Sequence, residues 1–235
     1  MSLLAGFIYR QFIHEPPIPT ESFEGRTIIV TGASAGLGLE ACRWMAQLKA
    51  SKIILACRNI EKGKAAAADI QKSTLCSPDI FDIWHLDMSS YASVQAFADR
   101  VQRDLPRLDA IVLNAGVHRR HFHITEDNEE VITTNVISLA LLAFLIHPKL
   151  RQTYSQYGVH THLTATGSEL YESAAFKERN APPGKLLEAF SDSKTLNMMD
   201  RYNTSKLLLM MFIREMAACY PVKSTGVIIN TVAPG

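Results

Sequence analysis

Two side chains with complementary acid–base chemistry lie four residues apart in the segment Tyr202-Asn203-Thr204-Ser205-Lys206 of this 235-residue chain. Residues with this spacing share one face of an α-helix. An ammonium group close to a phenol favours the phenolate and lowers the pKa of the phenol from about 10. A tyrosine tuned in this way can exchange a proton with a substrate alcohol or carbonyl near neutral pH. The segment also contains a glycosylation acceptor pattern, which we set aside because nothing else in the sequence indicates secretion.

A glycine-rich segment at 31–38, TGASAGLG, lies between an apolar run and a stretch with helical spacing of apolar residues. Glycine tolerates positive φ and lets the backbone approach a pyrophosphate closely. A helix that starts there offers free N–H groups and the positive end of its dipole to the phosphate. The segment therefore predicts a dinucleotide site, with a plain tight turn as the alternative. The predicted contacts are Gly32, Ser34, Gly36, Leu37 and Gly38.

The residue after the second apolar run distinguishes between the two nicotinamide dinucleotides. An acid there accepts a hydrogen bond from a ribose 2′-hydroxyl, whereas an arginine accommodates a 2′-phosphate. The chain has Arg58 at this point and no acid at Ala56, Cys57 or Asn59, which predicts NADP rather than NAD. Asp87 closes the third run and is a candidate partner of the adenine amino group. A helix-start or turn acid is the alternative for Asp87.

Short apolar runs alternate with helical periodicity along the whole chain, and these elements must bring the chemical groups together. Six strands are predicted, at 26–31, 52–57, 81–86, 109–113, 159–166 and 225–232. Helices are predicted at 37–48, 61–72, 90–105, 126–150 (ending near Pro148) and 202–219. Continuous apolar strands alternating with helices indicate an α/β fold of Rossmann type, a doubly wound parallel sheet in a three-layer αβα arrangement.

A leader at 1–22 precedes a single predicted NADP-binding domain at 23–235. Within this domain, 170–200 is a long connection that contains Pro182-Pro183-Gly184. Long connections in compact domains tend to be functional loops. We therefore expect 170–200 to be an inserted loop over the active site.

Composition and charge narrow the classes of partner. The chain is 47% apolar and 20% charged, as in ordinary globular proteins. A net charge of +1 gives no electrostatic reason to expect nucleic acid or an anionic membrane as a partner. The four cysteines lack CxxC spacing, which favours free thiols over a disulfide framework or a zinc site. The histidine-rich segment 118–123 lacks ordered ligand spacing, so we expect a solvated or substrate-facing loop and no metal.

The N-terminal residues show no clear targeting signal. No apolar run approaches the ~18 residues of a membrane span. The apolar stretch at 3–8 has no basic region before it and no clear cleavage site after it. We expect a short helix packed on the body there, with a membrane-surface contact as the alternative. The expected location is cytoplasmic.

The motifs, taken in order, resemble those of the short-chain dehydrogenase/reductase family from Thr27 to the last residue. The matching segments are TGASAGLG at 31–38, Asp87, NAG at 114–116, Asn135, Gly-Ser at 167–168, Tyr202 with Lys206, and NTVAPG at 230–235. The segments ACRN and LGLEA are most similar to the retinol-dehydrogenase-like branch. The proline-rich leader resembles fungal members, which often occur beside secondary-metabolite enzymes.

The resemblance implies a role for individual residues. Tyr202 matches the catalytic acid/base, and Lys206 matches the lysine that binds the nicotinamide ribose and lowers the pKa of the tyrosine. Ser168 matches the serine that hydrogen-bonds the reacting oxygen, and Asn135 matches the asparagine that holds a water in the proton relay. Further implied cofactor contacts are Asn114, Ala115, Gly116, Pro234 and Gly235.

The chain departs from the family pattern in two places. Ser168 and Tyr202 are further apart than is usual, so the insert must loop out if the two residues are to meet. The substrate-binding loop, helices and final strand that follow Pro-Gly in the family do not follow here, so we expect the C-terminal edge strand of the sheet to be missing.

The resemblance implies an NADP-dependent oxidoreductase that interconverts a carbonyl and an alcohol on a small hydrophobic substrate, with a role in secondary metabolism. The alternative is a C-terminally truncated relative that binds the nucleotide but is catalytically impaired. Homo-oligomers are common in the family, and the sequence does not distinguish a monomer from a dimer or tetramer.

Overall fold

The computed structural model describes residues 17–194 and 197–234. The helix expected at 3–8 and the cofactor contact expected at Gly235 lie outside these residues.

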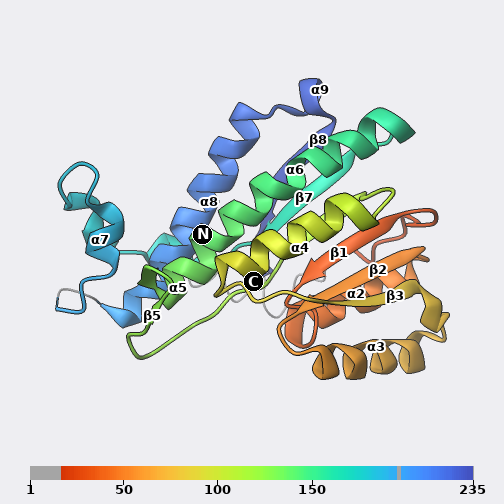
Figure 1. Ribbon diagram of the computed structural model, residues 1–235, viewed down its shortest axis with the longest axis horizontal. Coiled ribbons are helices and arrows are strands. Elements are labelled where there is room, and N and C mark those ends of the chain that lie inside the picture. Colours follow the sequence, from red (N-terminus) through yellow and green to blue (C-terminus); the bar gives the residue numbers. More distant parts are fainter. Residues whose placement is uncertain (1–16, 195–196, 235) are drawn as a thin grey trace.

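Six strands form a parallel central sheet (Figure 1). They are β1 (Thr27–Thr31), β2 (Lys52–Cys57), β3 (Phe81–His85), β4 (Ala110–Leu113), β7 (Thr161–Thr166) and β8 (Val227–Val232). Their order is β3-β2-β1-β4-β7-β8, so the direction of winding reverses between β1 and β4. Doubly wound sheets bind ligands at such a reversal, outside the carboxyl ends of the strands. The predicted Rossmann-type fold is confirmed, and β8 is the last strand at its edge in the described part of the chain.

Long helices cover the sheet on both sides (Figure 1). They are α2 (Gly36–Gln47), α3 (Ile60–Thr74), α4 (Tyr91–Asp104), α6 (Ser138–Tyr157) and α8 (Met198–Cys219). Buried side chains of α2 and α3 pack on one face of the sheet in one apolar cluster, and those of α4, α6 and α8 pack on the other face in a second cluster. The alternation of strand side chains between faces supplies both clusters, because Ile28 and Val30 join one and Ile29 joins the other.

Short elements connect this framework. The helices among them are α5 (Glu130–Ile132), α7 (Leu186–Phe190) and α9 (Val222–Thr225). Three 3₁₀ turns, η1 (Pro78–Ile80), η3 (Glu169–Ser173) and η4 (Lys177–Asn180), and one π-helical turn, η2 (Thr133–Ile137), are also present. A small hairpin pairs β5 (Ile124–Thr125) with β6 (Asn128–Glu129).

Three predicted helix boundaries are wrong. The helix expected to begin at 126 begins at Glu130, because the chain before it forms the hairpin of β5 and β6. The helix expected to end near Pro148 continues to Tyr157, with Pro148 inside it. Leu150 and Thr153, after the proline, are fully buried, and this packing offsets the hydrogen bond that proline cannot donate. The helix expected to begin at Tyr202 begins at Met198, because Asn197 caps it by accepting a hydrogen bond from the Met199 N–H at 3.1 Å. Tyr202 therefore lies in its second turn.

The expectation that no apolar segment approaches membrane-spanning length is also wrong. The helical stretch Glu130–Tyr157 is long and apolar enough to cross a membrane by length and composition, with a mean hydropathy of 1.8 over its most apolar window. Of that window, 61% is buried inside the fold, where α6 contributes to the apolar cluster shared with α4 and α8.

Candidate active site

The turn between β1 and α2 has the shape of a phosphate cradle. Gly32 and Gly36 adopt positive φ values of 67° and 58°, which glycine reaches without a steric penalty. A Cβ on Gly38 would lie 2.5 Å from the Gly32 carbonyl oxygen and 2.7 Å from the Asn114 Nδ2. The residue before the helix, Ala35, provides no side-chain cap. The first N–H groups of α2 are therefore left for an anion.

The loops after β1 and β4 are fastened together at the reversal of the sheet. The Thr31 Oγ1 accepts hydrogen bonds from the backbone N–H groups of Asn114 at 3.0 Å and Ala115 at 2.9 Å. The Asn114 Nδ2 donates to the Thr31 carbonyl oxygen at 3.1 Å. Asn114 thus acts structurally, and it also lines the cavity that contains Tyr202.

A cavity of about 260 Å³ opens beside the glycine turn. The predicted cofactor residues on its wall are Gly32, Ser34, Arg58, Asp87, Ala115 and Gly116. Asp87 also forms a turn, because its Oδ1 accepts hydrogen bonds from the Ser89 N–H at 2.9 Å and hydroxyl at 2.6 Å. Both readings of Asp87 are therefore compatible with its position. Gly36 and Gly38 shape the cradle but are not on the wall of this cavity.

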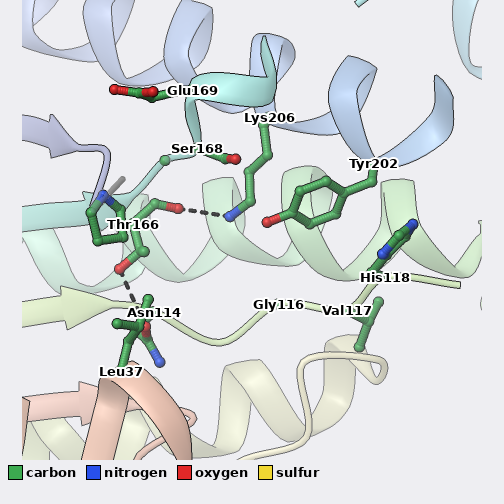
Figure 2. A pocket seen from close by; sticks show the side chains of 12 residues that line it. Leu37, Asn114, Gly116, Val117, His118, Thr166, Ser168, Glu169, Tyr202 and Lys206 are labelled. Atoms are coloured by element: carbon green, nitrogen blue, oxygen red, sulfur yellow. Dashed lines mark hydrogen bonds between the residues drawn. The ribbon is translucent and has the colours of Figure 1, made fainter. Parts of the chain in front are cut away.

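A second cavity, of about 420 Å³, contains the predicted acid–base pair (Figure 2). The predicted site residues on its wall are Leu37, Asn114, Gly116, Ser168, Tyr202, Lys206 and Pro234. Gly116 and Val117 line both cavities. The two cavities therefore adjoin at this loop.

Lys206 is buried beside Tyr202, with only 5% of the residue exposed. Its Nζ donates a hydrogen bond to the Thr166 carbonyl oxygen at 2.7 Å and lies 5.6 Å from the centre of the Tyr202 ring. Figure 2 shows the Tyr202 hydroxyl pointing toward this nitrogen. Burial lowers the pKa of Lys206 to about 8, because the charged form loses its hydration.

Asn135 supports the site from behind rather than from its wall. It lies in the π-helical turn η2 and is almost completely buried. Its Oδ1 accepts a hydrogen bond from the Val117 N–H at 2.8 Å, and its Nδ2 donates to the Val117 carbonyl oxygen at 2.9 Å and to the Ser205 Oγ at 3.1 Å. The side chain thereby joins the loop at 116–117 to the helix of Tyr202. A water-holding role for Asn135 stays a prediction.

Ser168 reaches the cavity despite its separation from Tyr202 in sequence. It caps η3, with its Oγ accepting a hydrogen bond from the Leu170 N–H at 3.3 Å. We expect the connection at 170–200 to lie over the site, and this stays a prediction. None of its described residues lines either cavity, because contacts with the start of α8 and with the region of β6 and α5 hold it at that end of the helix.

Sequence reasoning missed part of this site. The ring of His118 lies 5.0 Å from the Tyr202 ring, centre to centre, and lines the same cavity. Of the two readings of the 118–123 loop, this favours the substrate-facing one for His118. Its position two residues after Gly116, at the carboxyl end of a strand, could have indicated this. In the described part of the chain no cluster of three or more His, Cys, Asp or Glu residues is arranged to hold a metal ion.

The glycine cradle at the reversal of the doubly wound sheet thus lies next to a cavity that holds a tyrosine and a buried lysine. The family model described as short chain dehydrogenase matches residues 26–159. The chain is 40% identical over 232 residues to the short chain dehydrogenase/reductase dmxR8 of Cryptosporiopsis sp., covering 98% of this chain and 72% of that protein. It is 36% identical over 242 residues to the short-chain dehydrogenase anuD of Penicillium roqueforti, covering 100% and 61%. The chain belongs to the short-chain dehydrogenase family.

Solved structures agree with this assignment. A chain described as a short chain dehydrogenase from Shigella flexneri, complexed with NADP, has a TM-score of 0.66 and 25% identity, covering 92% of this chain and 80% of that one. An NADH-dependent reductase complexed with NAD shares the fold, with a TM-score of 0.68 and 17% identity, covering 91% and 79%. The family uses nicotinamide cofactors, and the fold occurs both in a protein that binds NADP and in one that binds NAD. The retinol-dehydrogenase-like placement stays a prediction.

Proposed function

We propose that the protein is an NADP-dependent oxidoreductase that interconverts a carbonyl and an alcohol on a small hydrophobic substrate. The observation that carries this proposal is the buried Lys206 beside Tyr202 in a cavity that adjoins the glycine cradle. The cradle fits a dinucleotide, because side chains larger than hydrogen are excluded at Gly38 and the start of α2 is uncapped.

Binding of the cofactor is assigned to residues of the first cavity and its rim. The turn at 32–36 and the start of α2 would hold the pyrophosphate. The Asp87 carboxylate would accept a hydrogen bond from the adenine amino group. Arg58 lies on the wall of this cavity and would hold the 2′-phosphate through charge-assisted hydrogen bonds. Because the fold is shared by NAD and NADP users, Arg58 is the feature that supports NADP.

The chemistry is divided between the cofactor and the chain. Bound NADP(H) supplies or accepts the hydride. Tyr202 donates a proton to the substrate oxygen in reduction and removes it in oxidation. The neighbouring ammonium of Lys206 stabilises the phenolate, and Ser168 orients the reacting oxygen through a hydrogen bond. Asn135 holds the 116–117 loop and, through Ser205, the helix of Tyr202 in place.

The cellular setting is part of the same proposal. The relatives named above come from fungi, which is compatible with a role in fungal secondary metabolism. A cytoplasmic location is proposed with it. Both parts rest on the resemblance rather than on the geometry of the site.

The proposal is tested by following NADPH and NADH oxidation with a panel of ketones and aldehydes, in the wild type, Arg58→Ala and the control Arg151→Ala on α6. We expect turnover with NADPH. Loss of a charge-assisted contact of about 1.5–3 kcal/mol weakens NADPH binding ~10- to 100-fold in Arg58→Ala, without changing NADH binding. A wild-type preference for NADH would contradict the cofactor assignment. Tight NADPH binding without turnover of any carbonyl would favour the alternative, a nucleotide-binding protein without this activity.

A further inference from the structure

Arg201, the residue directly before Tyr202, is buried in the first turns of α8 with only 1% exposed. Its Nη2 lies 3.1 Å from the Glu178 Oε1 and donates to the Phe190 carbonyl oxygen at 3.3 Å. Its Nε lies 3.5 Å from the Oε2 of Glu129, which is fully buried. The guanidinium also lies over the Phe190 ring, 4.9 Å from its centre. The Arg201 side chain therefore contacts Glu129, Glu178 and Phe190 at once.

These partners belong to two parts of the fold outside α8. Glu129 caps the start of α5 by accepting hydrogen bonds from the Val131 and Ile132 N–H groups at 3.0 and 3.2 Å. This helical turn leads directly into η2, which carries Asn135. Glu178 and Phe190 belong to the insert, here defined as 169–194. Arg201 thus joins α5, the insert and the helix of Tyr202.

The neighbouring residue Asp200 fastens the insert at a second point. Its Oδ1 accepts a hydrogen bond from the Ala175 N–H at 2.9 Å, and its Oδ2 accepts from the Phe176 N–H at 3.3 Å and the Thr204 hydroxyl at 2.8 Å. Phe176 in turn stacks on Phe190 with ring centres 6.0 Å apart. Figure 1 shows the resulting position of α7, beyond the N-terminal end of α8. Two consecutive residues hold the insert there.

Stability alone does not favour a charged group at this point. Burying ions is costly, and apolar side chains of similar volume often stabilise a core as well or better. Burial lowers the pKa of Arg201 and raises the pKa of Glu129, and the Nε and Nη1 of Arg201 have no hydrogen-bond partner among the described residues. The arrangement is better explained by the directional contacts it makes with three elements.

We propose that Arg201 is a positioning residue that fixes Tyr202 by locking the first turns of α8 onto α5 and the insert. Arg201 lines neither cavity, so it acts through the placement of Tyr202 and not on the substrate. The proposal rests on the proposed function to the extent that Tyr202 is the proton donor. A displacement of about 1 Å at a reacting group can cost ~10²-fold in rate.

The test compares Arg201→Met and Arg201→Lys with Arg214→Met, a matched control at an exposed position on the same helix. Trypsin digestion of the native protein reports how firmly Arg201 holds the insert. The insert carries exposed cleavage sites at Lys177, Arg179 and Lys185. We expect insert cleavage at least ~10-fold faster in Arg201→Met, with Lys62 and Lys64 in α3 still protected. Arg201→Lys gives an intermediate rate, and Arg214→Met the wild-type rate.

Two further measurements separate positioning from general stability. With a carbonyl substrate turned over by the wild type, kcat of Arg201→Met falls ~10- to 100-fold while the Kd for NADPH stays within about twofold. Arg201→Lys, which keeps the charge, recovers part of the kcat, and Arg214→Met keeps the wild-type kcat.

Unchanged insert cleavage or an unchanged kcat in Arg201→Met would overturn the proposal. Equally fast cleavage of α3 in Arg201→Met would mean that the whole fold is destabilised. Glu178→Gln then replaces Arg201→Met in the test, with the same expected rise in insert cleavage and fall in kcat, and the same results would overturn the proposal. Failure of the wild type to reduce any carbonyl would count against the proposed function alone, because insert cleavage is read without substrate.

Discussion

The ammonium of Lys206 makes a hydrogen bond with the Thr166 carbonyl oxygen and has little contact with solvent. A charge in such a low-dielectric position acts more strongly on a neighbouring phenol than an exposed lysine does. The same burial disfavours the charged form and lowers the pKa of Lys206 to about 8. Burial of Lys206 therefore costs the folded protein some stability while the side chain is charged.

The lowered pKa of Lys206 predicts that the stability of the cofactor-free protein depends on pH. The unfolded chain keeps Lys206 protonated up to about its ordinary pKa of 10.5, whereas the folded chain releases the proton near pH 8. Between these values the unfolded state binds more protons, so the contribution of Lys206 to the free energy of unfolding rises with pH and is lost as pH falls back through 8. The effect is at most about 3 kcal/mol.

Urea unfolding at pH 7.5 and pH 9.5, in the wild type and Lys206→Met, measures this contribution. The difference in unfolding free energy between the two proteins should change with pH in favour of the wild type at the higher value. A pH-independent difference would show that burial does not perturb Lys206.

At the scale of elements, the loops after β1 and β4 set the distance between the cofactor cradle and Tyr202. The glycine turn could be predicted from the sequence, because the spacing of its glycines and its place between a strand and a helix are both local features. The place of the insert could not be predicted, because it depends on Asp200 and Arg201 finding partners far away in sequence. The length of α6 was also missed, because the packing that overrides Pro148 is tertiary.

A Gly38→Ala substitution tests the closeness of α2 to β1. The added Cβ would meet the Gly32 carbonyl oxygen and the Asn114 side chain, with an overpacking cost of about 1–3 kcal/mol. We expect the Kd for NADPH to rise at least ~10-fold, measured by fluorescence titration. Gly158→Ala, which has an open Cβ position but a φ of 68° at the end of α6, should lose about 1 kcal/mol of stability and bind NADPH normally. Equal NADPH affinities of the two variants would contradict the assignment of the glycine turn between β1 and α2 as the nucleotide-binding site.

For the whole molecule, the alternation of apolar strands and helices was enough to predict a doubly wound sheet, because that pattern admits few other architectures. The sequence also predicted which residues gather at its reversal, since motifs at strand ends share one edge of the sheet. The position of His118 could indicate that it lies near the cavity, but its ring contact with Tyr202 could not be predicted, because neither periodicity nor spacing encodes the direction of a side chain in a loop.

Nucleotide binding at the reversal should stabilise the entire fold. At 100 times its Kd, a ligand that binds only the native state adds about 2.7 kcal/mol, which for a chain of this size raises Tm by about 5–10 °C. Differential scanning fluorimetry with NADPH should show this rise in the wild type. In Arg58→Ala at the same NADPH concentration the rise should be much smaller. Equal shifts would mean that Arg58 does not contact the nucleotide.

The most direct test of the central claim is the turnover of Tyr202→Phe with NADPH and a carbonyl that the wild type reduces. General acid catalysis contributes about 10²- to 10⁴-fold, so kcat should fall by that factor while the Kd for NADPH stays within a few-fold. Turnover by Tyr202→Phe within a few-fold of the wild type would contradict the assignment of Tyr202 as the proton donor.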